Sequence, residues 1–269
     1  MYNETVSPET CPDIKTFVRN RYFYGKLLDV SHFESEQAYF NEKRWLLNRL
    51  VTGYGVICGL NVGLTEDKKQ IWVDCGVALD QAGREIIVPV RSKPVPLPVP
   101  VPEPAPGGDA KARPGTNTND DDDDNCDDNV VSVYICYHDC PGDPEPVLAS
   151  DCDTPAPCST GSVRERYTIE IRPGKAGKID LMCEIPDVMT GGRLDYRQLA
   201  EFVTSSCAPV PCDPCIALAN IRLPQSGDTC CTGDIDISVR PIVYTNDLLF
   251  ELLLGLTSNN QNRLKGGKH

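Results

Sequence analysis

The chain has 269 residues, of which 40% are hydrophobic, and this is enough for one large domain or two ordinary ones with real cores. Acidic residues outnumber basic residues by 39 to 26. The resulting net charge of −13 argues against nucleic acids or anionic membrane surfaces as partners, because phosphate groups are bound by clustered cations. No stretch of the sequence is long and apolar enough to suggest a membrane span.

The N-terminus and the cysteines point to different compartments. The polar start, MYNETVSPETCPD, lacks a basic region followed by an apolar stretch, so we expect synthesis in the cytoplasm without a signal peptide. Cytosolic proteins rarely carry as many as 14 cysteines without a metal or a redox role. Three interpretations remain: disulfides formed after release into an oxidising environment, structural zinc, or buried thiols.

The first regular element expected is a long helix over residues 31–52. Ser31 and Glu34 form the S-x-x-E pattern of a capping box, and Gly53 is a typical helix end. The apolar residues recur at helical spacing and predict a buried stripe: Phe33, Phe40, Leu47 and Val51.

Two alternating segments, 56–64 and 71–77, predict a β-hairpin, and residues 85–90 predict a third strand. A turn centred between Glu66 and Asp67 would pair Val62 with Ile71 and Leu60 with Val73. The same register places Cys58 opposite Cys75, so these two residues are either a disulfide candidate or two core thiols.

A proline run follows from Val90 to Gly108, with proline at every second position through most of its length. Such a pattern favours polyproline II, either as a spacer between domains or as an extended arm on a neighbouring subunit. The apolar residues of the candidate arm are Val95, Leu97, Val99 and Val101. The Asp-rich stretch up to residue 129 is interpreted as a solvated acidic loop, because it lacks the spacing of an EF-hand calcium loop.

The second half predicts strands over 130–138, 166–173, 215–224 and 234–245, with helices over 193–206 and 246–256. Thr245 or Asn246 would cap the last helix. The predicted fold is α+β and strand-rich, with a long N-terminal helix and β-hairpins, then a mixed unit of about four strands and two helices. The expected organisation is a helix-plus-hairpin unit (1–92), a Pro-rich and acidic linker or arm (93–129), a second α+β unit (130–257) and a flexible tail (258–269). The two units can also pack as one body, because 53–92 and 130–245 can share a sheet.

Cysteine spacing provides two candidate metal sites. Four thiolates could close a tetrahedral zinc site: Cys207, Cys212, Cys215 and Cys230. Disulfides from Cys207, Cys212 and Cys215 to Cys230 or Cys231 are preferred, because prolines stiffen the C-x-x-C segment and the second pair is C-C. A second set lies on one strand face, Cys136, His138 and Cys140, with Cys126, Cys152 or Cys158 as further ligands, although a disulfide-stapled loop is favoured there too. No cofactor is expected unless structural zinc is present.

Catalytic patterns are missing from the sequence. The three histidines, His32, His138 and His269, have no nucleophile partner in the sequence. There is no G-x-S-x-G, no P-loop and no G-x-G-x-x-G motif. We therefore do not expect an enzyme.

Five blocks occur in order along the chain: RYFYGKLLDVSHFESEQAYFNEKRWLLNRLVTGYGVICGLNV, CGVALDQAGREIIVP, VYICYHDC…DPEPVL, RERYTIEI and RPIVYTNDLLFELL. They resemble a large, mostly uncharacterised bacterial family whose members occur with phage-tail-like contractile injection components. The resemblance implies a non-catalytic particle part, such as a baseplate, fibre, filament or decoration protein. It implies partners that are protein subunits of the same assembly, and no catalytic residues.

We therefore expect a structural subunit that is made in the cytoplasm and works in an extracellular or released particle, with the Pro-rich arm contacting neighbours. One alternative is a secreted, disulfide-stapled binding or adhesion module. A second alternative is a zinc-stabilised intracellular scaffold.

Overall fold

The computed structural model describes residues 15–98, 130–147, 158–179, 189–190, 193–204, 207, 209–223 and 235–265. Its first part is a helix followed by short strands: α1 (Val30–Leu47), a π-helical turn η1 (Asn48–Thr52), β1 (Gly55–Gly59), β2 (Val62–Leu64), β3 (Gln70–Val73), β4 (Gly76–Leu79), β5 (Glu85–Val88) and β6 (Val95–Pro96). Its second part contains two long strands and two helices: β7 (Val130–Pro146), β8 (Cys158–Pro173), β9 (Met189–Thr190), β10 (Arg193–Leu194), α2 (Tyr196–Val203), β11 (Ile216–Arg222), β12 (Ile235–Asp236) and α3 (Asn246–Lys265).

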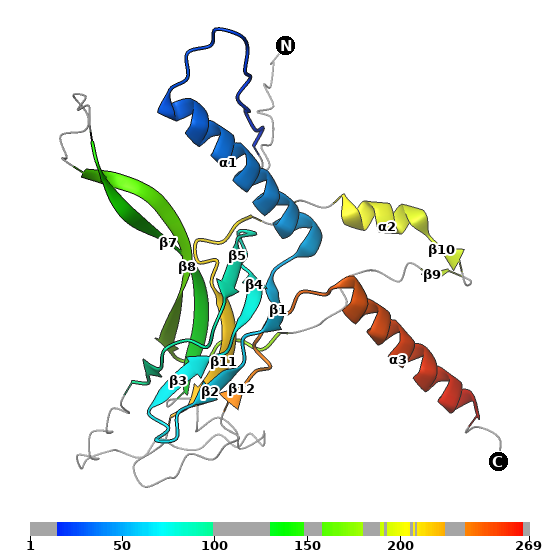
Figure 1. The fold of residues 1–269 in the computed structure, drawn as a ribbon. Coiled ribbons are helices and arrows are strands. Elements are labelled where there is room, and N and C mark those ends of the chain that lie inside the picture. The colour runs from blue at the N-terminus through cyan, green and yellow to red at the C-terminus, as the bar shows by residue number, and fades with distance from the viewer. Residues whose placement is uncertain are drawn as a thin grey trace, which may run out of the picture.

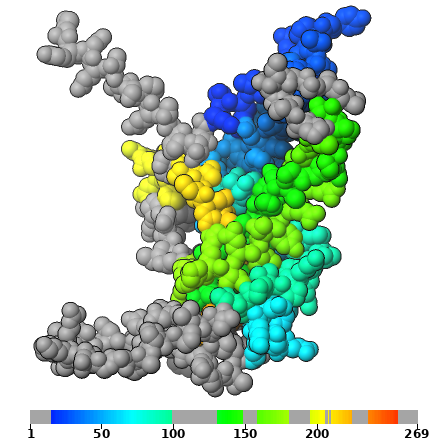
Figure 2. Space-filling model, turned by 90° about the vertical axis from the view of Figure 1, so that its left-hand side faces the viewer, coloured from blue at the N-terminus to red at the C-terminus, as the bar shows by residue number. Residues whose placement is uncertain are grey.

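The strands form antiparallel sheets (Figure 1). Two three-stranded sheets, β1-β4-β5 and β2-β3-β6, belong to the first part of the chain. The second part forms a four-stranded sheet, β12-β11-β7-β8, and a small β9-β10 ribbon. The long, curved β7–β8 hairpin extends well past β11 and forms a continuous band on the surface (Figures 1 and 2). The predicted α+β, strand-rich class is confirmed.

One hydrophobic core joins the two parts of the chain, although they do not share a described sheet. Ile71 and Val73 of β3 are fully buried in the same cluster as Val133 and Ile135 of β7. An isolated parallel bridge also joins Val56 to Ile242. The two parts therefore meet mainly through packed sheet faces.

The N-terminus of α1 differs from the expected one. Asp29 is the N-cap, and its carboxylate accepts a hydrogen bond from the Val30 N–H, while His32 Nδ1 accepts the Asp29 N–H at 3.1 Å. The predicted capping box of Ser31 and Glu34 is wrong, because the N-cap lies two residues earlier, at Asp29. His32 thus has a structural role at a helix end.

Replacing Asp29 with alanine is expected to destabilise the first turn of α1 by about 1 kcal/mol, because backbone donors lose their side-chain acceptor. The measurement is hydrogen exchange of the amides in that turn. Ser31→Ala is the matched control, since it removes the hydroxyl of the sequence-predicted cap and should leave the exchange rates unchanged. Equal acceleration in both variants would contradict the assignment of the cap.

The expected burial of the α1 stripe is also wrong. None of the α1 residues, all of which the structure describes, is buried, and Phe33, Phe40 and Leu47 are 50%, 62% and 59% exposed. The helix instead projects away from the sheets (Figure 1). Its C-terminal end is tied to the β4–β5 turn, where Asn48 Nδ2 donates to the Gly83 carbonyl at 2.9 Å and Arg44 pairs with Glu85 at 3.0 Å.

The hairpin formed by β2 and β3 has a register two residues away from the predicted one. Val62 pairs with Val73, and Leu64 pairs with Ile71. The turn is closed by the Thr65 N–H to the Gln70 carbonyl, at 2.9 Å, so its centre falls one residue later than expected. This single-residue displacement of the turn shifts every predicted pair.

The proline run enters the fold as an edge strand. Ile71 of β3 pairs with Val95, and the Leu97 N–H donates to the Lys69 carbonyl at 2.9 Å. Because β6 is at the edge of its sheet, its prolines need no partner for a missing N–H. Val95 and Leu97 pack on the core of their own chain, which corrects their assignment to an arm on a neighbour. Val99 and Val101 lie outside the described residues.

The remaining elements follow the sequence pattern with different ends. The strand expected over 234–245 is reduced to β12 and the bridge at Ile242. Thr245 Oγ1 accepts the Leu248 N–H at 3.3 Å, which confirms Thr245 as one of the two expected caps of α3. The helix continues to Lys265, well into the segment expected to be a flexible tail.

Candidate functional site

Two helices present exposed apolar surface on the same molecule. In α3, Leu249, Phe250 and Leu252 are 43%, 60% and 46% exposed, as the α1 stripe is. Both helices project from the sheets in different directions (Figure 1). A surface of this kind is typical of a contact with another macromolecule.

An apolar groove of about 430 Å³ lies between the bases of these helices. Most of its lining side chains are apolar or aromatic, and one, Arg240, is a cation. The lining residues are Thr52, Gly53, Tyr54, Ile179, Ile237, Ser238, Arg240, Pro241, Ile242 and Tyr244. Gly55 borders it at a close approach of two chain segments, since a Cβ there would lie 2.6 Å from the Pro241 carbonyl carbon. The groove is thus framed by backbone that leaves no room for a side chain at Gly55.

Arg240 is the unusual group in this groove. Its Nε donates to the Leu218 carbonyl at 2.9 Å, whereas its buried Nη2 has no hydrogen-bond partner among the described residues. Burial lowers the pKa of Arg240 from its usual value, which reports the cost of desolvating its charge. Arg240 is among the groove-lining residues, so a negative charge that entered the groove would offset part of this cost by charge attraction.

The β4–β5 turn is a junction of the structure. Asp80 is fully buried and accepts hydrogen bonds from the N–H groups of Ala82 and Arg84 at 2.9 and 2.8 Å, and from Arg84 Nε at 2.7 Å. The Arg84 guanidinium lies 4.6 Å from the centre of the Tyr137 ring. The Gln81 N–H donates to the Pro214 carbonyl at 3.2 Å. The turn therefore links the loop before β11 to the β7–β8 hairpin, and it also holds the base of α1.

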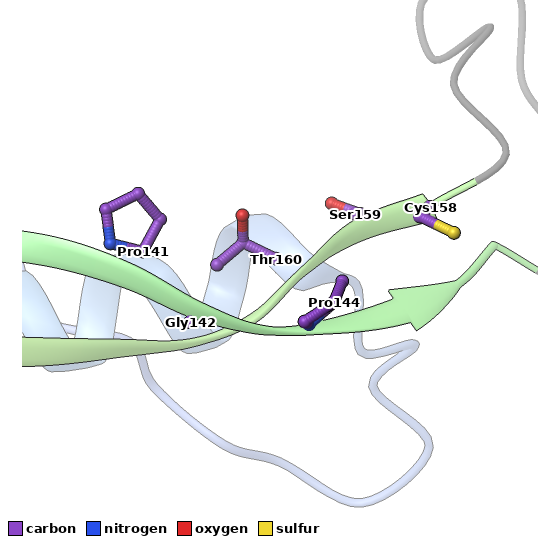
Figure 3. A pocket seen from close by; sticks show the side chains of 6 residues that line it. All are labelled: Pro141, Gly142, Pro144, Cys158, Ser159 and Thr160. Carbon is purple, nitrogen blue, oxygen red and sulfur yellow. The ribbon is translucent and has the colours of Figure 1, made fainter.

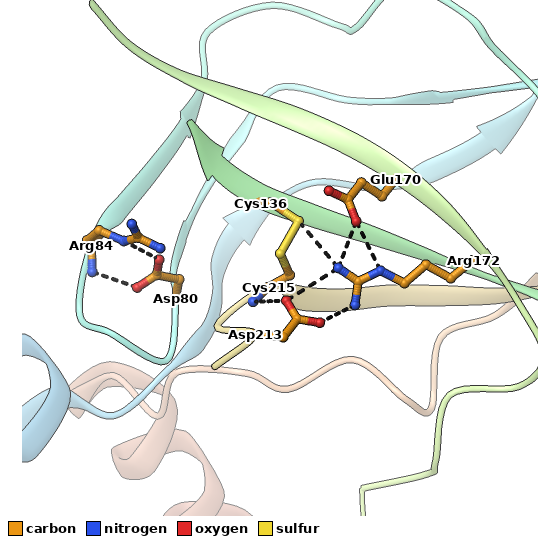
Figure 4. Close-up of a disulfide and its surroundings, with 7 residues drawn as sticks. All are labelled: Asp80, Arg84, Cys136, Glu170, Arg172, Asp213 and Cys215. Atoms are coloured by element: carbon orange, nitrogen blue, oxygen red, sulfur yellow. Dashed lines mark hydrogen bonds and ion pairs between the residues drawn. A yellow bond between two sulfur atoms is a disulfide. The ribbon is translucent and has the colours of Figure 1, made fainter. Parts of the chain in front are cut away.

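A disulfide joins Cys136 of β7 to Cys215, the residue before β11 (Figure 4). Because Ile135 pairs with Ile216, the two cysteines are the next opposite pair in the antiparallel register, with Cα atoms 4.6 Å apart. This separation is typical of directly opposed residues, which a disulfide can bridge. The bond closes a loop between residues 79 positions apart in the sequence.

Arg172 lies beside the disulfide and organises the charges there (Figure 4). Its Nη2 lies 3.9 Å from Cys136 Sγ and donates to Glu170 Oε2 at 2.7 Å, and its guanidinium forms a forked pair with Asp213. The hydrogen bonds from Arg172 hold the pKa of Asp213 below its usual value. The guanidinium also stacks over the Tyr134 ring, 4.2 Å from its centre. The cation is thus fixed from several sides next to a sulfur atom.

This arrangement changes the interpretation of the cysteine-rich segment. Cys215 is bonded to Cys136, so it is not joined to Cys230 or Cys231 and is not a zinc ligand in this state. Cys207 and Cys212 are free thiols, while Cys230 and Cys231 lie outside the described residues. Among the described residues, the only grouping with metal-ligand distances is Cys136, Glu170 and Cys215, whose ligand atoms lie within 4.8 Å of one another. The disulfide itself occupies both sulfurs of that grouping.

The second metal set is separated in the same way. Cys136 is in the disulfide, His138 is exposed, and Cys140 is a half-buried free thiol farther along β7. Cys158 pairs with Pro146 at the far end of the hairpin. Cys126 and Cys152 lie outside the described residues.

Both alternatives for Cys58 and Cys75, a disulfide or two core thiols, are wrong. Both residues are exposed free thiols, and Cys58 pairs with Val77 of β4. The expected pairing depended on the register that the turn at Thr65–Gln70 displaces.

A shallow hollow of about 380 Å³ lies near the tip of the β7–β8 hairpin (Figure 3). Small side chains and prolines line it: Pro141, Gly142, Pro144, Cys158, Ser159 and Thr160. Glu145 of β7 pairs with Ser159 of β8 beside this hollow, and Asp143 accepts a hydrogen bond from the Ser162 hydroxyl at 2.5 Å.

Comparisons with known proteins found no match, either to a model of a protein family or to a curated protein. Within the part of the chain that the structure describes, no helix combines the length and the apolar character needed to cross a membrane.

Proposed function

We propose that the protein is a non-catalytic structural subunit of an extracellular or phage-tail-like particle, in which copies of the chain contact one another through α1, α3 and the Arg240 groove. The observation that carries this proposal is the exposure of the apolar side chains on two projecting helices. Most helical stability in proteins comes from packing of an apolar face, and α1 has no buried residue, so a covering surface would stabilise it. The resemblance of the five sequence blocks supports the phage-tail-like setting.

A second copy fits the groove because α3 has complementary chemistry. Asp247 and Glu251 lie one turn apart, and Phe250 follows Asp247 by three positions, which places these two side chains on neighbouring parts of the helix surface. The surface of α3 therefore carries carboxylates beside apolar side chains. The groove has an apolar lining and one cation, Arg240, whose Nη2 has no hydrogen-bond partner among the described residues. The α3 helix of one copy in the groove of the next would bury the exposed residues and bring a carboxylate to the Arg240 side chain. Such head-to-tail contacts generate rings or filaments.

The test is a charge exchange across the proposed contact. Glu251→Arg is expected to weaken self-association by more than tenfold in Kd, because truncating or reversing one member of a desolvated pair costs about 2 kcal/mol or more. Sedimentation velocity over a concentration series measures the change. Adding Arg240→Glu to the same chain is expected to restore part of the association.

Glu66→Arg makes the same change in net charge on the β2–β3 turn, far from either helix, and should associate as the unmodified protein does. Association that is equally weakened by Glu66→Arg would show that net charge, rather than the groove, controls assembly. Unchanged association of Glu251→Arg would contradict the proposed contact.

A freestanding secreted binding module is the second candidate, and the Cys136–Cys215 disulfide favours it equally, since disulfides persist in oxidising environments. The two candidates differ in where the protein is found. A subunit is expected in purified particles at a fixed ratio to other components, whereas a freestanding module is expected outside them.

A further inference from the structure

Three cysteines with different environments belong to the region at the start of β11. Cys136 is 6% exposed and bonded to Cys215, while Cys212 is an exposed free thiol in the sequence Cys212-Asp213-Pro214-Cys215. The C-x-x-C spacing is one that a disulfide readily closes, and it recurs in proteins that exchange thiols and disulfides. A free thiol therefore accompanies an existing disulfide at the spacing that exchange requires.

The loop that carries this motif is held in a turn. The Cys215 N–H donates to Asp213 Oδ1 at 3.3 Å, an interaction that folds an aspartate back on the residue two positions later. The Pro214 carbonyl is fixed by the Gln81 N–H. These contacts fix Asp213, Pro214 and Cys215, and Cys212 is the residue directly before this turn.

Arg172 lies beside Cys136, the sulfur that would leave as a thiolate in an exchange reaction. Its Nη2, at 3.9 Å from Cys136 Sγ, is a charged hydrogen-bond donor beside the sulfur that would become a Cys136 thiolate, although Glu170 and Asp213 share the same guanidinium. Neighbouring cations stabilise thiolates, and a more stable thiolate leaves faster in exchange. The same guanidinium donates a hydrogen bond to Asp213 inside the C-x-x-C segment, so Arg172 contacts both the disulfide and the segment that carries Cys212.

We propose that Cys136, Cys215 and Cys212 form an intramolecular thiol–disulfide exchange site. The Cys212 thiolate attacks Cys215 Sγ, a Cys212–Cys215 bond forms, and the Cys136–Cys215 bond breaks. The electron pair of the broken bond stays on Cys136, which leaves as a thiolate beside Arg172. The proton lost by Cys212 goes to solvent, and no external oxidant or reductant is consumed. The exchange converts a brace between β7 and β11 into a local loop, so it releases the loop before β11 from the hairpin.

The experiment follows the free thiol by peptide mapping. The folded protein is moved from pH 5 to pH 8 without reductant, quenched in acid at set times, denatured at low pH and alkylated with N-ethylmaleimide. Alkylated Cys136 and a Cys212–Cys215 bonded peptide are expected to appear together after the pH rise, as thiols deprotonate. Arg172→Gln is expected to slow their appearance about tenfold, and Arg172→Lys, which keeps the charge, is expected to recover part of the rate.

Two serine variants separate exchange from other events. Cys212→Ser should leave Cys136 bonded at every time point, whereas Cys207→Ser, which removes the free thiol five positions earlier, should leave the exchange unchanged. Alkylation of Cys136 in Cys212→Ser, or a wild-type protein in which Cys212 alone is alkylated throughout, would overturn the proposal. Isolation of the untreated protein with Cys136 and Cys215 both as thiols would also overturn it.

Discussion

Replacing Cys136 with serine is expected to lower the free energy of unfolding by about 4 kcal/mol. The disulfide joins residues 79 positions apart, and a loop of that length removes a large amount of conformational freedom from the unfolded chain. This is the dominant effect, because the chain-entropy model of disulfides gives about 4 kcal/mol for loops approaching 100 residues.

Urea unfolding at pH 5 measures this effect, since exchange with Cys212 requires thiolates and is slow in acid. Cys58→Ser is the matched control, because Cys58 is an exposed free thiol, and it should change the free energy of unfolding by less than about 0.5 kcal/mol. A loss below about 1 kcal/mol in Cys136→Ser would mean that the brace between β7 and β11 does not constrain the unfolded chain.

Asp80→Asn is expected to cost about 3 kcal/mol of folding stability. The carboxylate is fully buried, and its removal as an anion leaves Arg84 without its charged partner and weakens the hydrogen bonds that close the turn. The amide of asparagine keeps the shape, so the loss reports charge and hydrogen bonding rather than a cavity.

Thermal or urea unfolding measures this loss, and Asp74→Asn provides the comparison. Asp74 also pairs with an arginine, Arg91 at 2.8 Å, but that arginine is 57% exposed, so water screens the pair and the expected change is below about 1 kcal/mol. Similar losses in both variants would remove the special role assigned to the β4–β5 turn. Faster hydrogen exchange at the base of α1 in Asp80→Asn would confirm that the turn holds the helix.

The sequence predicts the fold class and most elements because hydrophobic periodicity is a local property. The alternation in 71–73 and 130–135 identifies the core strands β3 and β7, whose inward residues are fully buried. The same periodicity identifies α1 as a helix, but the stripe that it predicts is not buried, and the apolar side chains of α1 are spread around the helix. A helical stripe carries no information on whether its covering surface comes from the same chain or from another one.

Pairings between segments that are distant along the chain could not be predicted from the sequence. The bond between Cys136 and Cys215 depends on the register of β7 and β11, which no local pattern encodes. With 14 cysteines, spacing favoured partners close in the sequence, such as Cys212 with Cys230. The register error at β2–β3 has a different origin, since moving the centre of the turn by one residue changes every pair by two positions.

The groove residue Arg240 was also missed, for a physical reason. Its position in the segment Ile237–Ile242 gives no sign that its guanidinium is partly buried, because this depends on packing against β11 and on the approach of Gly55 to Pro241. Arg172 is a similar case, since its contacts with Asp213 and Cys136 join three separate segments. The chemistry of this protein is thus concentrated at junctions that only the tertiary structure creates.

The central claim is that α1 and α3 are contact surfaces between copies of the chain. Hydrogen exchange of the α1 and α3 amides, measured together with the mass in solution over a range of protein concentrations, tests it most directly. The account predicts masses above 29.5 kDa with protected helices at high concentration, and loss of protection in both helices as dilution returns the monomer. A 29.5 kDa monomer at every concentration, with the two helices protected throughout, would contradict it.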